Sequence, residues 1–409
     1  LNRPNPSGEH DYWKASVNIA ENAQVGFQAA DDLVTNVVFS GLTLTGFGGS
    51  AIYSEGSFAD LTVSNCSFVA CGGASAKNAL GVSYHALHAP CVGNVTVLDD
   101  RFIGDTCCAY LPVVVDGATC TVSRCTLVGN NTTGLRLPAS NASVTRVEQV
   151  NIVSNGIGSM VLLQATGTAP RQYVLDSAFV RNKFRNGGAS ITVTSSGKQE
   201  NTVVTQVRGC RFEGNVLWMS NVQDDATTGI EFTRYCNTHQ QALVADCSWV
   251  GNELHATSSS KRVTATIAID QNTYVFLYVV DCAFEDNLID VAYSGDSANS
   301  SRCGIIQVST AYDTTTFYNC LFTGNSISGG NGSDGEIIRG SSAGGGTTCN
   351  FTFNNCIIGD YAEPHRVFSF APFAKTLTIN DGVVEGLDSD LVDIGAGTLV
   401  TNRVSVAKP

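Results

Sequence analysis

Apolar and polar residues alternate with a period of two in short segments that recur along the chain. Each segment follows one template: two apolar residues separated by variable ones, then Asn or Asp, then Cys, with Phe two and Asn five positions after the Cys. Clear copies lie at 61–71, 120–130, 173–182, 205–215, 242–252, 277–287, 315–325 and 351–361, and weaker ones at 37–47, 95–105, 145–155 and 377–386. Alternation of this kind predicts strands.

The Cys position gives each copy an anchor that can be compared between copies. The anchors are Leu42, Cys66, Asp100, Cys125, Val150, Ser177, Cys210, Cys247, Cys282, Cys320, Cys356 and Gly382. They are about 24 to 38 residues apart, which is the range of stacked solenoid repeats. Most are preceded by Asn or Asp, residues that tolerate left-handed backbone angles, so we expect a bend there.

A third short apolar stretch follows most copies, at 50–56, 133–139, 160–165, 190–195, 229–234, 289–294 and 336–340. Three strands per repeat without a helical crossover predict a right-handed parallel β-helix. We therefore expect an all-β solenoid of about twelve coils over residues 36–409, with residues 1–35 as an N-terminal arm or cap.

The Phe-x-x-Asn elements at 179–182, 212–215, 284–287 and 322–325, with GGSAI at 48–52 and GGASI at 187–191, carry a resemblance to known proteins. They are similar to the repeats of polymorphic outer-membrane proteins and related surface proteins. The chain thereby resembles the right-handed parallel β-helix proteins of the pectate-lyase-like superfold. This resemblance implies the fold but not one activity, because the superfold carries lyases, hydrolases, adhesins and fibre proteins.

Composition and charge narrow the functional classes. The net charge of −13 argues against nucleic-acid binding, and no apolar run is long enough to insert into a membrane. Fifteen cysteines without a C-x-x-C pair indicate disulfides in an oxidising compartment, although some anchor cysteines can instead remain buried thiols. The disulfide candidates, joined within a coil or to its neighbour, are Cys210, Cys236, Cys247, Cys282, Cys303, Cys320, Cys349 and Cys356.

Glycosylation sequons point to the same compartment. We expect N-linked glycans at Asn141, Asn299 and Asn331, which fall between predicted strands, and as second choices at Asn94, Asn131 and Asn350. Together with the cysteines, these sites predict an extracellular protein, secreted or on a cell surface.

One template position holds asparagine in seven consecutive copies: Asn130, Asn155, Asn182, Asn215, Asn252, Asn287 and Asn325. A polar ligand track is one interpretation. We favour a structural ladder, in which amides hydrogen-bond from coil to coil.

Candidate catalytic residues are few. Asp246 and Asp281 share a position on successive copies, so their spacing of about 5 Å would suit a retaining carboxylate pair. They also occupy the bend position, and we favour turn formation as the reason for them. The NTD, GHG and RIK elements of polygalacturonase-like hydrolases are absent. His85 and His88 are three apart, which on a strand places them on opposite faces. We therefore expect no metal site and no cofactor. Bound Ca²⁺ is expected only if the protein is an enzyme.

These observations predict a structural or adhesive rod, a subunit of a glycosylated surface fibre. Its partner would be a second copy, joined head to tail through the coil ends and the N-terminal arm. The alternative is a secreted polysaccharide lyase or glycoside hydrolase with a groove on the outer face of coils 7 to 11, which are the coils of Cys210 to Cys356. Longer intervals between anchors there imply projecting loops.

Overall fold

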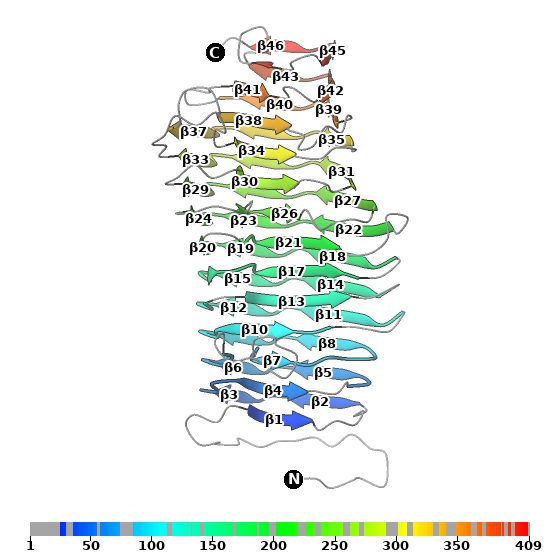
Figure 1. Cartoon of the computed structure of the whole chain (residues 1–409), viewed down its shortest axis with the longest axis vertical. Helices are drawn as coiled ribbons and strands as arrows, with labels where there is room; N and C mark the ends of the chain where they lie inside the picture. The colour runs from blue at the N-terminus through cyan, green and yellow to red at the C-terminus, as the bar shows by residue number, and fades with distance from the viewer. Residues whose placement is uncertain are drawn as a thin grey trace.

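The computed structural model describes residues 25–29, 36–54, 58–73, 85–112, 117–131, 133–139, 143–166, 169–185, 188–195, 202–219, 226–233, 239–256, 262–269, 274–291, 302–308, 314–329, 335–340, 349–360, 366–369, 374–385, 387, 392–393 and 397–407. Every regular element in these ranges is a strand, and the strands stack coil upon coil into a rod (Figure 1). No helix long and apolar enough to cross a membrane occurs within these ranges.

Two of the sheets extend from near one end of the rod to the other. Sheet A contains β1 (Val25–Ala29), β4 (Ser50–Ser54), β7 (Leu87–His88), β10 (Cys107–Tyr110), β13 (Thr133–Ala139), β17 (Val161–Ala165), β21 (Ile191–Ser195), β26 (Ile230–Phe232), β30 (Arg262–Ile269), β34 (Arg302–Val308), β38 (Gly335–Gly340), β41 (Arg366–Ser369) and β44 (Val392–Asp393), with β25 (Ala226–Thr227) beside β30. Sheet B contains β2 (Val37–Ser40), β5 (Leu61–Ser64), β8 (Val95–Leu98), β11 (Thr119–Ser123), β14 (Val144–Glu148), β18 (Arg171–Leu175), β22 (Thr202–Arg208), β27 (His239–Ala245), β31 (Tyr274–Val280), β35 (Thr314–Tyr318), β39 (Cys349–Asn354), β42 (Ala374–Asn380) and β45 (Thr398–Asn402).

A third long sheet and a shorter fourth one complete the rod. Sheet C contains β3 (Thr43–Thr45), β6 (Ser67–Val69), β9 (Arg101–Ile103), β12 (Thr126–Val128), β15 (Asn151–Val153), β19 (Ala178–Val180), β23 (Arg211–Glu213), β28 (Ser248–Val250), β32 (Ala283–Glu285), β36 (Leu321–Thr323), β40 (Ile357–Gly359), β43 (Val383–Glu385) and β46 (Ser405–Ala407). Sheet D contains β16 (Gly156–Ile157), β20 (Lys183–Arg185), β24 (Val216–Met219), β29 (Glu253–Ala256), β33 (Leu288–Val291) and β37 (Ser326–Gly329).

This architecture confirms a parallel β-solenoid and corrects details of the expectation. Sheet D adds a fourth strand to the middle coils, and the apolar stretch at 289–294 begins in its strand β33 rather than in sheet A. Sheets B and C each have thirteen strands within the described residues, because β45 and β46 form a copy with Arg403 at the bend and Val404 as anchor, which the template did not reveal. Strand β1 lies within the segment expected as an arm or cap, and it pairs with β4.

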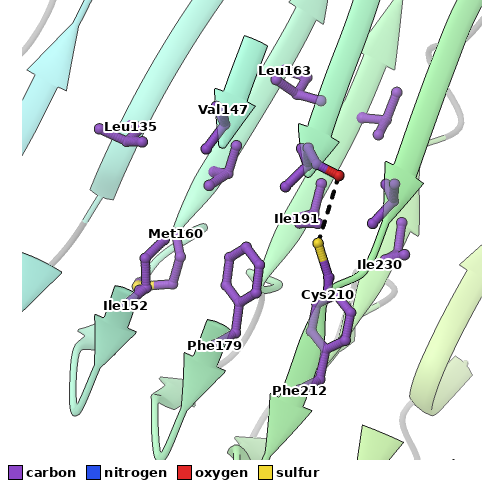
Figure 2. Close-up of a cluster of buried hydrophobic side chains, with 14 of the residues drawn as sticks. Leu135, Val147, Ile152, Met160, Leu163, Phe179, Ile191, Cys210, Phe212 and Ile230 are labelled. Carbon is purple, nitrogen blue, oxygen red and sulfur yellow. Dashed lines mark hydrogen bonds between the residues drawn. The ribbon is translucent and has the colours of Figure 1, made fainter. Parts of the chain in front are cut away.

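The core is built by placing equivalent residues of successive coils on top of one another. Along sheet B, Val63 and its successive register partners as far as Ile379 form one column. All of these side chains point inward and are completely buried. The column is Val63, Val97, Val122, Val147, Val174, Val207, Val244, Val279, Phe317, Phe353 and Ile379. Figure 2 shows Val147 in this interior with Leu163 and Ile191, which come from sheet A.

Each coil bends twice at residues with left-handed backbone angles, five positions apart. The first bend is the predicted one: φ is between 48° and 56° at Asn65, Asp99, Asp176, Asp246, Asp281, Asn319, Asn355 and Asp381. The second, which the sequence did not predict, lies before the ladder asparagines at residues such as Gly129, Gly214, Gly251 and Gly324. A positive φ favours Gly, Asn and Asp, which occupy most positions of both bends. Other residues also adopt it, such as Arg124 and Gln149 at the first bend and Ala70, Ser154 and Arg181 at the second.

The anchor side chains form hydrogen bonds along the rod axis instead of disulfides. The backbone N–H of one anchor donates to the next anchor's side chain: Val150 to Ser177 Oγ at 3.1 Å, and Cys210 to Cys247 Sγ at 3.4 Å. The anchor thiols in turn donate to backbone carbonyls, as Cys210 does to Val174 at 3.6 Å (Figure 2). A small side chain with a polar atom can form these bonds at an anchor, and Cys, Ser and Asp all provide one, whereas the anchors Leu42, Val150 and Gly382 do not.

The disulfide expectation must be corrected for the anchors. In the structure Cys210, Cys247, Cys282, Cys320 and Cys356 are buried free thiols, as are the seven other cysteines whose side chains are described. The thiols of Cys210, Cys247, Cys282 and Cys320 each donate to a backbone carbonyl of the preceding coil. Burial raises the pKa of the Cys120 and Cys125 thiols to about 12, so neither is a reactive thiolate. Cys236 and the side chains of Cys303 and Cys349 lie outside the described part of the chain.

Aromatic rings stack at the Phe position of the template. Phe179, Phe212, Trp249, Phe284 and Phe322 form one continuous stack, with ring centroids 4.6 to 5.0 Å apart and planes within 8° of parallel. Figure 2 shows Phe179 and Phe212 side by side at this position. The rings fill the coil interior and fix the spacing between coils.

The seven ladder asparagines have the structural role that we favoured. Each Nδ2 from Asn130 to Asn287 donates to the Oδ1 of the next asparagine at 2.8 to 3.0 Å. Each Oδ1 from Asn155 to Asn325 also accepts the backbone N–H of the preceding asparagine. All seven side chains are buried, so they satisfy one another and form no ligand track.

An aspartate occupies the ladder position one coil before Asn130. Asp105 Oδ1 accepts the N–H of Cys71 at 2.7 Å, but the buried Oδ2 has no hydrogen-bond partner within the described residues. Burial raises the pKa of Asp105 from 3.8 to about 7, and burial likewise raises that of the anchor Asp100 to about 7. Both carboxyl groups therefore fold most favourably with a proton attached.

We expect Asp105→Asn to stabilise the protein at pH 8 by about 2 kcal/mol, because the amide replaces a buried charge and can donate to Asn130 Oδ1. The folded wild type keeps its Asp105 proton up to about pH 7, whereas the unfolded chain releases it near pH 4. Stability from this group is thus complete below about pH 4 and lost as the pH rises to about 7. Between pH 4 and pH 8, the free energy of unfolding measured with urea should fall less in the variant than in the wild type. The fall that remains in the variant comes from Asp100. An unchanged slope would contradict this account, and the exposed Asp360→Asn is the control.

We expect Asn215→Ala to lower the free energy of unfolding by about 3 kcal/mol. The change leaves the N–H and Nδ2 of Asn182 and the carbonyl of Phe179 without their partner. Asn402→Ala removes a similar amide bond, to Asn380 Oδ1 at 2.7 Å, but in an exposed ladder where water can replace it. Denaturant unfolding should therefore show a larger loss of unfolding free energy in Asn215→Ala than in Asn402→Ala. Equal losses would show that burial of the ladder does not strengthen its contribution to stability.

Candidate functional site

An open groove lies on the outer face of sheet B, across the coils of Cys210, Cys247 and Cys282. It has a volume of about 540 Å³ and is formed by consecutive strands. Its lining residues are Val204 and Gln206 on β22, Gln241, Ala242 and Leu243 on β27, and Phe276 and Tyr278 on β31. The groove lies within the coils 7 to 11 on which the sequence placed the alternative enzyme.

Strand alternation explains how these residues come together. Val244 and Val279 point inward, so the positions next to them point outward. In-register pairing then aligns Gln206, Leu243 and Tyr278 in one outer column, and Val204, Gln241 and Phe276 in a second. The two columns run along the rod axis and form a continuous surface.

The groove combines apolar rings with unengaged amides. Phe276 is 38% exposed and Tyr278 is 49% exposed, and the ring of His239 stacks beside Phe276 with centroids 6.3 Å apart. The side-chain amides of Gln206 and Gln241 have no hydrogen-bond partner within the described residues. Among the residues that the structure describes, the lining contains no ionisable group other than the Tyr278 phenol. Such a surface suits a neutral ligand with both apolar faces and hydroxyl groups.

The two carboxylates considered for catalysis lie at the bends where β27 and β31 end, not in the groove lining. Asp246 Oδ2 accepts from Arg208 Nε at 2.8 Å, and Asp281 Oδ1 accepts from Asn319 Nδ2 at 2.9 Å. Both have a positive φ. Their positions are thus accounted for by the bend and by these contacts.

Two of the sequon asparagines are exposed and accessible. Asn94 and Asn131 both lie on the surface, and Asn94 Oδ1 accepts from Thr119 while its Nδ2 stays available. Asn350 is partly buried in β39. Asn141, Asn299 and Asn331 lie outside the described residues.

The histidine pair does come together, contrary to the argument from strand faces. His85 precedes β7 rather than belonging to it, and its ring lies 6.0 Å from that of His88 and 5.5 Å from that of Tyr110. Burial, with Arg136 as a second cause, lowers the pKa of His88 to about 4, so its imidazole is neutral at pH 7. No group of three metal-ligating side chains occurs among the residues that the structure describes.

Sequence reasoning missed the groove because its residues occupy the variable positions of the template. One signal was present: at 274–280 the sequence YVFLYVV is apolar at outward as well as inward positions, which marks an outer face that is not simply solvated. The glutamines gave no signal, since isolated polar residues are expected on any outer face.

Comparison with known proteins adds no functional assignment to this geometry. No family model matches the chain, and neither a curated protein nor a solved structure matches it. The argument for function therefore depends on the residues of the groove and of the surrounding rod.

Proposed function

We propose that this protein is an extracellular adhesive rod, secreted or cell-surface and glycosylated, that binds a neutral carbohydrate chain in the groove of sheet B. The observation that supports this most directly is the pairing of Phe276 and Tyr278 with the free amides of Gln206 and Gln241. We also propose that the solenoid winds in a right-handed sense, because parallel crossover connections almost always do. We propose that it has about twelve coils.

The chemistry of a sugar fits this lining. One face of a pyranose ring presents C–H groups, which pack on the electron-rich face of an aromatic ring, while its hydroxyls both donate and accept hydrogen bonds. A glutamine amide also donates and accepts, so it can satisfy a pair of hydroxyls. Because the groove runs along the rod axis over three coils, it suits a linear chain of sugars better than a single one.

Binding is favoured over bond cleavage for a specific reason. Cleavage of a glycosidic bond needs a carboxylic acid and a second carboxylate, or a base, facing the substrate. The described part of the lining has neither, and Asp246 and Asp281 are already engaged at the bends. A lyase or hydrolase is therefore the weaker proposal for this groove.

We expect Phe276→Ala and Tyr278→Ala each to weaken binding of neutral oligosaccharides about tenfold, because each removes a stacking surface. A glycan array would identify the ligand, and titration calorimetry would measure its dissociation constant. Ile357→Ala is the control, since Ile357 is an apolar side chain that is 52% exposed but lies on sheet C, outside the groove. Binding that is unchanged in both groove variants would refute the groove as the site, and sugar release on incubation would support the enzyme instead.

Head-to-tail assembly is a second proposal, supported by the coil that contains β45 and β46. These are the last strands of sheets B and C in the described part of the chain. Leu399 is 37% exposed, although its register partner Leu377 in the preceding coil is 1% exposed, and Val406 is 43% exposed. This coil end presents apolar side chains and strand edges that the first coil of a second copy would cover. Of the arm expected to reach across, residues 1–35, only residues 25–29 are described, and they form β1.

We expect Leu399→Lys to abolish assembly, because a charged group would be buried between the two coils. Val383→Lys is the matched control, since Val383 is 39% exposed on the side of the rod, in the preceding coil. Analytical ultracentrifugation and electron microscopy should show filaments or oligomers in the wild type and the control but monomers in Leu399→Lys. Assembly that persists in Leu399→Lys would remove this coil end from the contact.

A further inference from the structure

The outer face of sheet D carries a second cluster of chemically distinctive side chains, away from the groove. Its outward positions form two columns along the rod axis. One column is Arg185, Trp218, His255 and Asp290, and the other begins with Lys183, Val216 and Glu253. We call these residues the sheet D cluster.

Trp218 is fixed in position by its neighbour in the next coil. The His255 ring stacks on the indole with centroids 4.3 Å apart and planes 18° from parallel. His255 is itself held on both sides, because Nε2 lies 3.0 Å from Glu253 Oε2 and Nδ1 lies 3.3 Å from Asp290 Oδ2. His255 therefore fixes the orientation of the Trp218 indole, although Trp218 is 49% exposed.

The other face of the indole is turned toward the strand that carries two cations. Trp218 is the register partner of Arg185, so this face is directed toward β20, about 4.8 Å away. No cation covers a Trp218 face among the described residues. Lys183 and Arg185 are both exposed, project from the same side of β20, and have no ion-pair partner in the described part of the chain.

Charge divides the sheet D cluster into two ends. Two unpaired cations lie on one side of the indole, and two carboxylates with His255 lie on the other. In a protein with a net charge of −13, an unpaired Arg and Lys beside an exposed tryptophan form a local site for an anion. The carboxylates can accept hydrogen bonds from hydroxyl groups and would repel an anion placed at their end.

We propose that the sheet D cluster binds a sulfated sugar, in addition to the neutral chain proposed for the groove. The pyranose ring packs against the exposed part of the Trp218 indole, and its sulfate group lies between Lys183 and Arg185. A sulfate ester suits this pair because its three terminal oxygens can accept from both cations at once. Glu253 and Asp290, on the opposite side of the indole, repel the sulfate and so set the orientation of the ligand.

The test uses a sulfated galactan oligosaccharide, the same oligosaccharide without sulfate, and a carboxylated oligosaccharide of equal length as probes. Titration calorimetry on the full chain at low salt should give at least tenfold tighter binding of the sulfated probe than of the unsulfated one at this site. Trp218→Ala should weaken binding of the sulfated probe about tenfold, and Arg185→Gln about fivefold. The affinity should also fall as the salt concentration rises.

Controls separate this site from the groove and from general charge effects. Arg211→Gln removes an exposed cation from β23 of sheet C and should leave binding of the sulfated probe unchanged. Phe276→Ala should also leave it unchanged, so that failure of the groove proposal does not decide this one. Wild-type affinity in Trp218→Ala or Arg185→Gln would overturn the proposal. Equal or tighter binding of the carboxylated probe would overturn the assignment of sulfate.

Discussion

The constraint on which this structure depends is that each coil is stacked on the next in register, at a spacing of about 4.8 Å. Every side chain then meets the equivalent side chain of the next coil. A buried position is therefore stable only if its residue can pack against, or hydrogen-bond to, its own kind. Valine and phenylalanine meet this condition by contact, and asparagine meets it because one amide both donates and accepts.

The same constraint explains which buried residues are costly. Asp105 occupies an asparagine position, but a carboxylate can only accept, so its Oδ2 is left without a partner and burial raises its pKa to about 7. At the anchors a thiol or hydroxyl accepts from one coil while it donates to a backbone carbonyl. The anchor cysteines are thus explained without disulfides, and the proposal of an extracellular location depends on the exposed sequons and the ligand-binding surfaces.

Stacking also builds the two proposed binding surfaces. A groove three coils long arises when outward residues of β22, β27 and β31 align, and the sheet D cluster arises when β20, β24, β29 and β33 align. In both cases an aromatic ring is fixed by neighbouring coils rather than by a loop. Such a rigid outer face loses little conformational entropy when a ligand binds, which favours recognition of extended chains.

The sequence by itself determined the parallel solenoid, the first bend, the inward column and the asparagine ladder, because each is a repeated local choice that the template displays. It could not determine the second bend or sheet D, whose residues vary too much between coils. The fate of the anchor cysteines was also beyond it, since pairing depends on where the sulfur atoms point. Only the tertiary structure decided which outward residues meet: Gln206 and Tyr278 are 72 positions apart in the chain, yet they lie two coils apart in one column. The template identifies the inward positions, because burial restricts them to similar residues in every coil. The neighbours of an outward residue are decided only when coils of unequal length are stacked in register.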